Sequence, residues 1–63
     1  MKLEHLVSIN GAALAVYYVG DCYYQYEIAF WDGSIYQPQE MYDTANKALN
    51  VGMESIKITI GYQ

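Results

Sequence analysis

Few residues in this chain of 63 amino acids have side chains suited to catalysis or metal binding. It contains one histidine, His5, and one cysteine, Cys22. This pair cannot supply the four ligands of a structural zinc site. Ser8, Ser34 and Ser55 have no base nearby in the sequence and no nucleophile-elbow context. We therefore expect a protein that is not an enzyme, with no catalytic residue, no cofactor and no metal site.

The carboxylates also have simple structural explanations. Asp32 belongs to an Asp-Gly turn, and the sequence Asp32-Gly33-Ser34 lacks the run of oxygen ligands found in calcium loops. A pair such as Glu27 with Asp32 remains conceivable, although no spacing selects it. Cys22 is predicted either to be a small apolar residue at the start of a strand or to be an exposed thiol that could cross-link two chains.

Tyrosine is the most prominent residue type. The chain has eight tyrosines, and five of them lie within residues 17–26. Because a strand alternates its side chains between two faces, adjacent tyrosines cannot all enter one core. Tyrosine and tryptophan are enriched at protein interfaces. The sequence therefore predicts a contact surface for a protein partner, for which the candidate residues are Tyr18 (or Tyr17), Tyr23, Glu27, Trp31, Asp32 and Tyr36.

The charge balance favours a protein partner over nucleic acid. Three lysines oppose seven carboxylates, there is no arginine, and the formal net charge is −4. Proteins that bind nucleic acid neutralise phosphates with clustered basic residues, and residues 3–46 contain none. Direct binding of nucleic acid is therefore not expected. An acidic surface suits a basic partner, including a nucleic-acid-binding protein, although the charge alone is also explained by solubility.

The sequence predicts a protein of the cytoplasm. The first residues lack the basic start and long apolar run of a secretory signal. The longest apolar stretch, Ala12 to Val19, is far shorter than a membrane span. A single free cysteine also fits a reducing compartment.

Four strands are expected in the first two thirds of the chain, over residues 3–9, 12–19, 23–31 and 34–37. Asn10-Gly11 and Asp32-Gly33 predict two-residue turns with positive φ at both central positions. In the first strand, alternation assigns Leu3, His5, Val7 and Ile9 to one face and Glu4, Leu6 and Ser8 to the other. In the third strand, Tyr24, Tyr26, Ile28 and Phe30 are expected in the core, which leaves Tyr23 and Trp31 as exposed rings.

One short helix is expected next. Thr44 (or Asp43) is predicted to cap it, Ala45, Ala48 and Leu49 share one face, and Gly52 is predicted to end it with Met53 packing back on Leu49. The alternation of residues 56–62 predicts a last strand. The expected fold is α+β, a single domain over residues 1–63, with an antiparallel sheet of four to five strands in ββββαβ order and the helix on one face.

A resemblance to a known family rests on several short motifs. They are Tyr26-x-Ile28-x-Phe30, Asp32-Gly33, Tyr42-x-Thr44, Ala48 and Gly52-Met53-Glu54-Ser55-Ile56-Lys57. Through them, residues 24–58 resemble the small YegP-like domains. The resemblance implies a strand pair, a helix entry and a closing strand, and it implies no activity.

These observations lead to a functional hypothesis with two alternatives. Small size, acidity and aromatic richness are similar to those of phage-encoded inhibitors and adaptors such as anti-CRISPR proteins and DNA mimics. Such a protein would bind a basic partner through exposed Tyr and Trp side chains edged by carboxylates. The first alternative is a homo-oligomeric regulatory or structural protein of the bacterial cytosol whose aromatic face forms its own dimer interface. The second is a module that stacks single-stranded nucleic acid.

Overall fold

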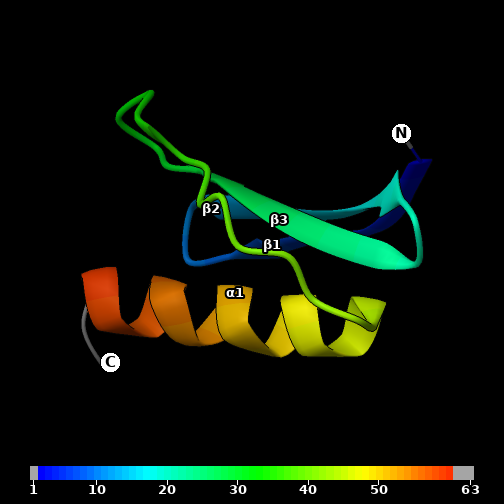
Figure 1. The fold of residues 1–63 in the computed structure, drawn as a ribbon. Coiled ribbons are helices and arrows are strands. Elements are labelled where there is room, and N and C mark those ends of the chain that lie inside the picture. The colour runs from blue at the N-terminus through cyan, green and yellow to red at the C-terminus, as the bar shows by residue number, and fades with distance from the viewer. Residues whose placement is uncertain (1, 61–63) are drawn as a thin grey trace.

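The computed structural model describes residues 2–60 and arranges them in two layers, a sheet and a helix (Figure 1). The strands are β1 (Lys2–Ile9), β2 (Ala12–Gly20), β3 (Tyr23–Ala29) and β4 (Ile35–Tyr36), and the helix is α1 (Ala45–Ile60). The strands pair antiparallel in the order β1-β2-β3-β4. The predicted α+β class and the four strands are confirmed, and the element order over residues 2–60 is ββββα.

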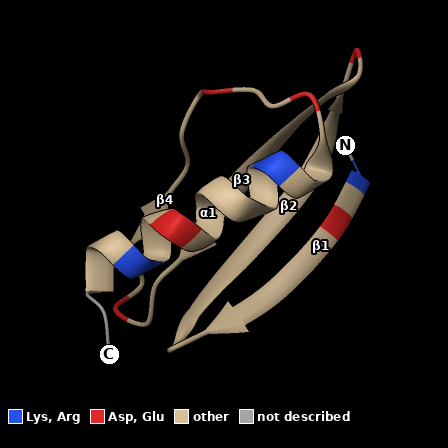
Figure 2. Ribbon diagram, turned by 90° about the horizontal axis from the view of Figure 1, so that it is seen from below, with Lys and Arg blue, Asp and Glu red and all other residues tan. Residues whose placement is uncertain are grey.

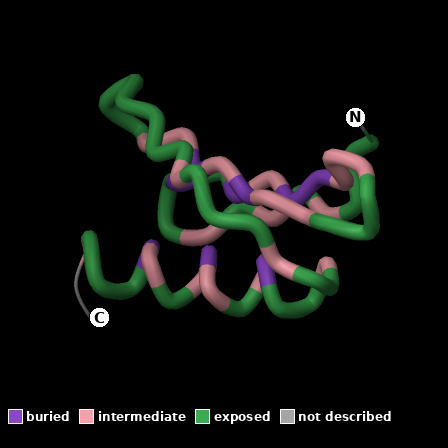
Figure 3. The backbone as a smooth tube through the Cα atoms, viewed as in Figure 1, coloured by how far each residue is buried: buried purple, intermediate pink, exposed green. Residues whose placement is uncertain are grey.

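The core lies between the sheet and α1, where the buried positions gather in Figure 3. It contains three residues of β2, two of β3 and two of α1, namely Ala12, Leu14, Val16, Tyr26, Ile28, Ala48 and Ile56. Tyr24 and Phe30 are partly buried and pack against this cluster. The predicted core face of the third strand is therefore confirmed.

The turns agree with the sequence at one hairpin and differ at the other. Asn10 and Gly11 have φ of 49° and 82°, as expected for the β1–β2 turn. In the β3–β4 hairpin the N–H of Gly33 donates to the carbonyl of Phe30 at 2.9 Å, so the central residues are Trp31 and Asp32. The prediction of a two-residue turn at Asp32-Gly33 is wrong, and β3 accordingly ends at Ala29 instead of Trp31. This hairpin projects away from the helix (Figure 1).

A bulge in β1 changes which face one residue occupies. Leu3 pairs with Tyr17 and His5 pairs with Val16, so Glu4 is the extra residue in β1. Since Val16 points into the core, its neighbour Tyr17 and the cross-strand partner Leu3 point away from it. The prediction that Leu3 shares a face with His5 is therefore wrong.

The helix begins as predicted and continues past its predicted end. The Oγ1 of Thr44 accepts a hydrogen bond from the N–H of Lys47 at 3.0 Å, which identifies Thr44 as the N-cap. The helix then runs for 16 residues through Gly52. Gly52 therefore does not end the helix, and the Schellman contact expected between Met53 and Leu49 is wrong. The predicted last strand is wrong over residues 56–60, and residues 61 and 62 lie outside the described residues.

A close contact with the sheet explains the glycine inside this helix. A Cβ at position 52 would lie 2.6 Å from Cδ1 of Leu14 and 3.2 Å from Cδ1 of Tyr26. Both distances are shorter than ordinary carbon–carbon contacts. Glycine at this position lets α1 approach the sheet, and Ala48, Gly52 and Ile56, spaced four residues apart, form its buried stripe.

Candidate interaction surface

Among residues 2–60, no helix covers one of the two faces of the sheet (Figure 1). Ala13, Ala15 and Tyr17 of β2 point to this side because they alternate with the core residues Ala12, Leu14 and Val16. Their cross-strand partners on β1 and β3 point to the same side of the sheet, and so does Ile35 of β4, which pairs with Ala29. We call this surface the open face.

The open face has aliphatic ridges along two strands and a floor of small side chains between them. Leu3 and Leu6 of β1 are 57% and 67% exposed, and Ile35 of β4 is 58% exposed. The floor is formed by three alanines on the two central strands, Ala13, Ala15 and Ala29. The large aliphatic side chains are therefore left in solvent beside the alanines, while Tyr17, Gln25 and Glu27 fill the other central positions of the face.

Two polar side chains of the open face, those of Gln25 and Glu27 on β3, are already engaged. Glu27 is its only charged residue within the part of the chain that the structure describes, and its Oε1 accepts a hydrogen bond from Nε2 of Gln37 at 2.8 Å. Nε2 of Gln25 donates to the carbonyl of Gln39 at 3.2 Å. Tyr17 also lies on this face, but only 9% of it is exposed. Binding at this face would leave few polar groups unpaired.

Most charged residues lie elsewhere. Figure 2, seen from the helix side, shows them on α1, on the turns and on the segment that leads into the helix. Lys2 and Glu4 lie at the start of β1, on the side of the helix, where Lys2 pairs with Tyr18. The acidity of the chain is therefore concentrated away from the open face.

Two of the predicted contact residues are exposed rings, as expected. Tyr23 is 44% exposed at the start of β3, and Trp31 is 65% exposed in the turn that follows β3. The Trp31 ring meets Phe30 edge to face, with ring centres 5.9 Å apart, and packs over Gly11. Since seven residues of mostly extended chain separate Tyr23 and Trp31, the two rings mark opposite ends of the sheet.

The other four predicted contact residues do not join these rings in one cluster. Tyr18 faces the helix side, is partly buried, and its hydroxyl accepts a hydrogen bond from the N–H of Cys22 at 3.2 Å. Tyr36 pairs with the core residue Ile28 and is 47% exposed on that same side. Glu27 lies on the open face, and Asp32 lies in the β3–β4 turn, where it accepts two hydrogen bonds from Ser34. These bonds lower the pKa of Asp32.

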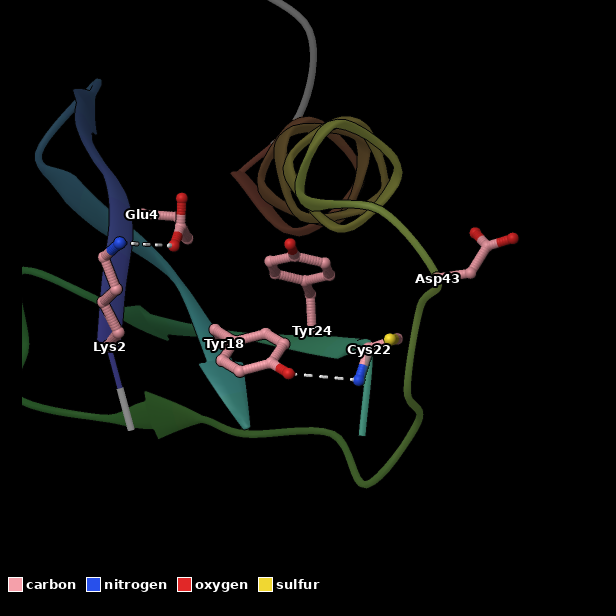
Figure 4. A pocket seen from close by; sticks show the side chains of 6 residues that line it. All are labelled: Lys2, Glu4, Tyr18, Cys22, Tyr24 and Asp43. Carbon is pink, nitrogen blue, oxygen red and sulfur yellow. Dashed lines mark hydrogen bonds and ion pairs between the residues drawn. The ribbon is translucent and has the colours of Figure 1, made fainter. Parts of the chain in front are cut away.

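A cavity of about 420 Å³ opens on the helix side, next to the first turn of α1 (Figure 4). The Tyr24 hydroxyl points toward the helix, with Lys2 and Glu4 on one side and Cys22 and Asp43 on the other. The carboxylates are paired with lysines, Glu4 with Lys2 at 3.9 Å and Asp43 with Lys47 at 3.3 Å. Cys22 is exposed and has a φ of 65°. The carboxylate on the same side as the thiol, that of Asp43, is therefore engaged by Lys47.

Three tyrosine rings and a serine meet between β3, β4 and α1. The Tyr26 hydroxyl lies 2.9 Å from Oγ of Ser55, and its ring is about 6 Å from those of Tyr36 and Tyr42. Burial raises the pKa of Tyr26. Burial, together with the hydrogen bond to Glu40, raises the pKa of Tyr42 to about 12. With their pKa values raised, the Tyr26 and Tyr42 phenols stay neutral near pH 7 and act as structural hydrogen-bonding groups.

Comparisons with known proteins give no match from which a role for the open face could be inferred. No family model, curated protein or solved structure matches this chain. The resemblance of residues 24–58 to YegP-like domains stays a prediction. Within residues 2–60, no group of three or more His, Cys, Asp and Glu side chains is placed to hold a metal ion, and no helix there has the length and apolarity to cross a membrane.

Proposed function

We propose that the protein is a non-enzymatic protein–protein interaction module of the cytoplasm that binds its partner through the open face. The observation that carries this proposal is the exposure of Leu3, Leu6 and Ile35 around the uncovered alanine floor. Contiguous exposed apolar patches of this kind mark interaction sites in soluble proteins. Trp31 and Tyr23 lie at the two ends of this sheet and add aromatic contact area.

Covering these side chains is energetically significant for so small a chain. Full burial of one leucine or isoleucine contributes about 1.5–3 kcal/mol, and the three are each more than half exposed. Their burial by a partner would therefore contribute roughly 3–5 kcal/mol. A domain of this size has a folding free energy of roughly 3–9 kcal/mol. The two free energies are of the same order, so a partner that covers the open face would stabilise the folded chain substantially.

Two charge substitutions test the proposal. Leu6→Glu places a carboxylate on the open face, and Ile58→Glu places one on the outer side of α1, where Ile58 is 78% exposed. Both replace an exposed aliphatic residue, so both variants should fold. Tagged parent and variants are used to recover partners from a lysate of the organism that encodes the chain. We expect Leu6→Glu to lose the partner and Ile58→Glu to keep it. Equal recovery by all three proteins would refute the open face as the binding surface.

A narrower form of the proposal is a small acidic inhibitor or adaptor, similar to anti-CRISPR proteins, that occupies the groove of a basic protein. The net charge of −4 supports it, and the carboxylates of Glu27 on β3 and Asp32 in the β3–β4 turn would make the contacts. Reversal of two acidic residues, Glu27→Lys/Asp32→Lys, should then abolish binding. Recovery of the basic partner should also fall as salt increases. Binding that neither change weakens would contradict this form.

A further inference from the structure

We propose that the partner of the open face is a second copy of this chain, so that two sheets stack across a two-fold axis. The inference rests on the proposed function and specifies which protein the face binds. Two properties of the face, its relief and its charge, support a second copy, and its area determines how strong the association is.

The relief of the open face is complementary to itself. In the β1 ridge (Leu3 and Leu6), Leu6 lies opposite Ala15, and in the β4 ridge, Ile35 lies opposite Ala29; β1 lies about 14 Å from β4 at the usual strand spacing. Larger side chains, those of Tyr17, Gln25 and Glu27, occupy neighbouring positions of the central strands. In a symmetric pair, each surface meets an identical surface. The leucines of one copy can therefore rest on the alanines of the other, and small side chains allow the sheets to approach closely.

The distribution of charge favours the same partner. A chain with a net charge of −4 repels its own copies unless the contacting surfaces are nearly uncharged. The open face satisfies this condition, because Glu27 is its one charged residue among residues 2–60 and already accepts a hydrogen bond from Gln37. A basic partner would contact a single carboxylate, that of Glu27, on the open face. The open face therefore suits an uncharged surface like itself better than a basic one.

The available area predicts a weak dimer. The strands β1, β2 and β3, spaced ~4.8 Å apart and about eight residues long, span roughly 14 Å by 26 Å, and the two residues of β4 add little, so the face measures roughly 400 Å² for each copy. Two copies would bury roughly 800 Å² before side-chain relief is added, against about 1,200–2,000 Å² for stable complexes. We expect association that depends on concentration in the range of tens to hundreds of micromolar.

Edge-to-edge pairing of β1 is the competing way to form a dimer. Lys2 at the start of β1 and the bulge at Glu4 interrupt the regular edge. Charged residues and bulges at an edge are features that hinder such pairing. At the opposite edge, the backbones of Tyr24 and Tyr42 form a bridge that continues the pairing past β4. The strand edges are therefore less suited to dimer formation than the open face.

Alanine methyl groups provide a direct test. Of the six alanines, Ala13, Ala15 and Ala29 form the open-face floor, whereas Ala12, Ala45 and Ala48 pack on the side of the helix. In a chain labelled at alanine methyls, dilution from about 500 to 10 µM should shift the three floor signals and leave the other three in place. Sedimentation over this range should give a weight-average mass that rises toward twice the 7.2 kDa of the chain.

The same two variants identify the surface. We expect Leu6→Glu to weaken the dimer at least tenfold, because it places a charge against an apolar floor, while Ile58→Glu leaves it unchanged. A strict monomer up to 500 µM would overturn the inference. A dimer whose β1 amide signals shift on dilution while the floor methyls do not would overturn it too, because the edge would then be the interface.

The outcomes separate this inference from the proposed function. If the chain is a monomer and its open face recovers a different protein in a manner sensitive to Leu6→Glu, the second-copy inference fails and the interaction module stands. If the chain is a monomer and Leu6→Glu changes no recovery, both fail. A dimer disrupted by Leu6→Glu supports both, since the second copy is then the protein partner.

Discussion

Replacing Gly52 with alanine tests how closely α1 packs on the sheet. At a helix position with free space around it, glycine to alanine stabilises a protein by about 1 kcal/mol, because alanine has the higher helix propensity. At position 52 the added methyl group would lie 2.6 Å from Cδ1 of Leu14 and 3.2 Å from Cδ1 of Tyr26. Leu14 is fully buried and Tyr26 is 2% exposed, so neither has room to move freely.

The two effects have opposite signs, and their sizes decide the result. Forcing an extra methyl group into a packed core costs about 1–3 kcal/mol. Subtracting the propensity gain of about 1 kcal/mol leaves a net loss of roughly 1 kcal/mol, within a range of about zero to 2. Since Asn50 is exposed on the same helix, Asn50→Ala lacks the clash and should stabilise the chain by a few tenths of a kcal/mol.

A double-mutant cycle then assigns the loss to Leu14. Leu14→Val shortens the side chain that meets the new methyl group, at a cost of about 1 kcal/mol on its own. In the Gly52→Ala background this cost should largely disappear, which gives a favourable coupling of about 1 kcal/mol. Urea unfolding followed by circular dichroism at 222 nm measures all four proteins. A gain of about 1 kcal/mol for Gly52→Ala, with no coupling to Leu14→Val, would refute the close packing described above.

Three further changes test the helix, its contact with the sheet and the buried phenols. Tyr26→Phe should cost about 1 kcal/mol in urea unfolding, because it removes the hydroxyl that bonds Ser55 across the sheet–helix interface; an unchanged midpoint would show that this bond adds nothing. Thr44→Ala should also cost about 1 kcal/mol through loss of the N-cap, whereas Thr59→Ala, on an exposed part of the same helix, should have little effect. Folding raises the pKa of Tyr42 from 10.0 to about 12, so its contribution to stability is complete below pH 10 and is lost as the pH rises toward 12. Thermal unfolding between pH 9 and pH 12 measures this loss, and Tyr42→Phe should flatten the curve; an equally steep curve in that variant would assign the loss to other groups.

The sheet could be read from the sequence because its signals are local. Asn10-Gly11 supports positive φ at both positions, and the alternation around Tyr26 and Ile28 assigns them to the core. The bulge at Glu4 could not be read, since its effect depends on the register with β2, and that register is a property of the pair of strands. Most of the sheet was therefore predictable from signals within single segments, although the local signal at Asp32-Gly33 placed the β3–β4 turn one residue too late.

The end of the helix was mispredicted because the same residues fit two patterns. Ile56, Ile58 and Ile60 alternate as in a strand, whereas Ala48, Gly52 and Ile56 repeat every four residues as in a helix. Burial separates the two patterns, because Ile56 is fully buried and Ile58 is 78% exposed. Gly52 resembled a helix end, and its requirement for close packing against Leu14 appears only once the sheet is in place.

The candidate surface was predicted only in part, for a related reason. The exposure of Tyr23 follows from alternation along β3, whereas Trp31 is exposed because it lies in the turn after that strand. The two aliphatic ridges of the open face lie on β1 and β4, and no pattern within either segment alone predicts that they share a face. Leu3 reaches this face only through the bulge, and Ile35 lies in a strand too short to show a period. Leu6 was correctly assigned to the face opposite His5, but its exposure follows from the position of the single helix.

The order of the elements along the chain has a consequence for synthesis on the ribosome. Every strand pairing joins neighbours in sequence, so the meander can form as it emerges, whereas the helix that covers its inner face is made afterwards. At about 5–20 residues per second, the 16 residues of α1 take roughly one to three seconds to add. During that interval Leu14, Val16 and Ile28 remain uncovered, and both faces of the nascent sheet are open to chaperones or to a neighbouring chain.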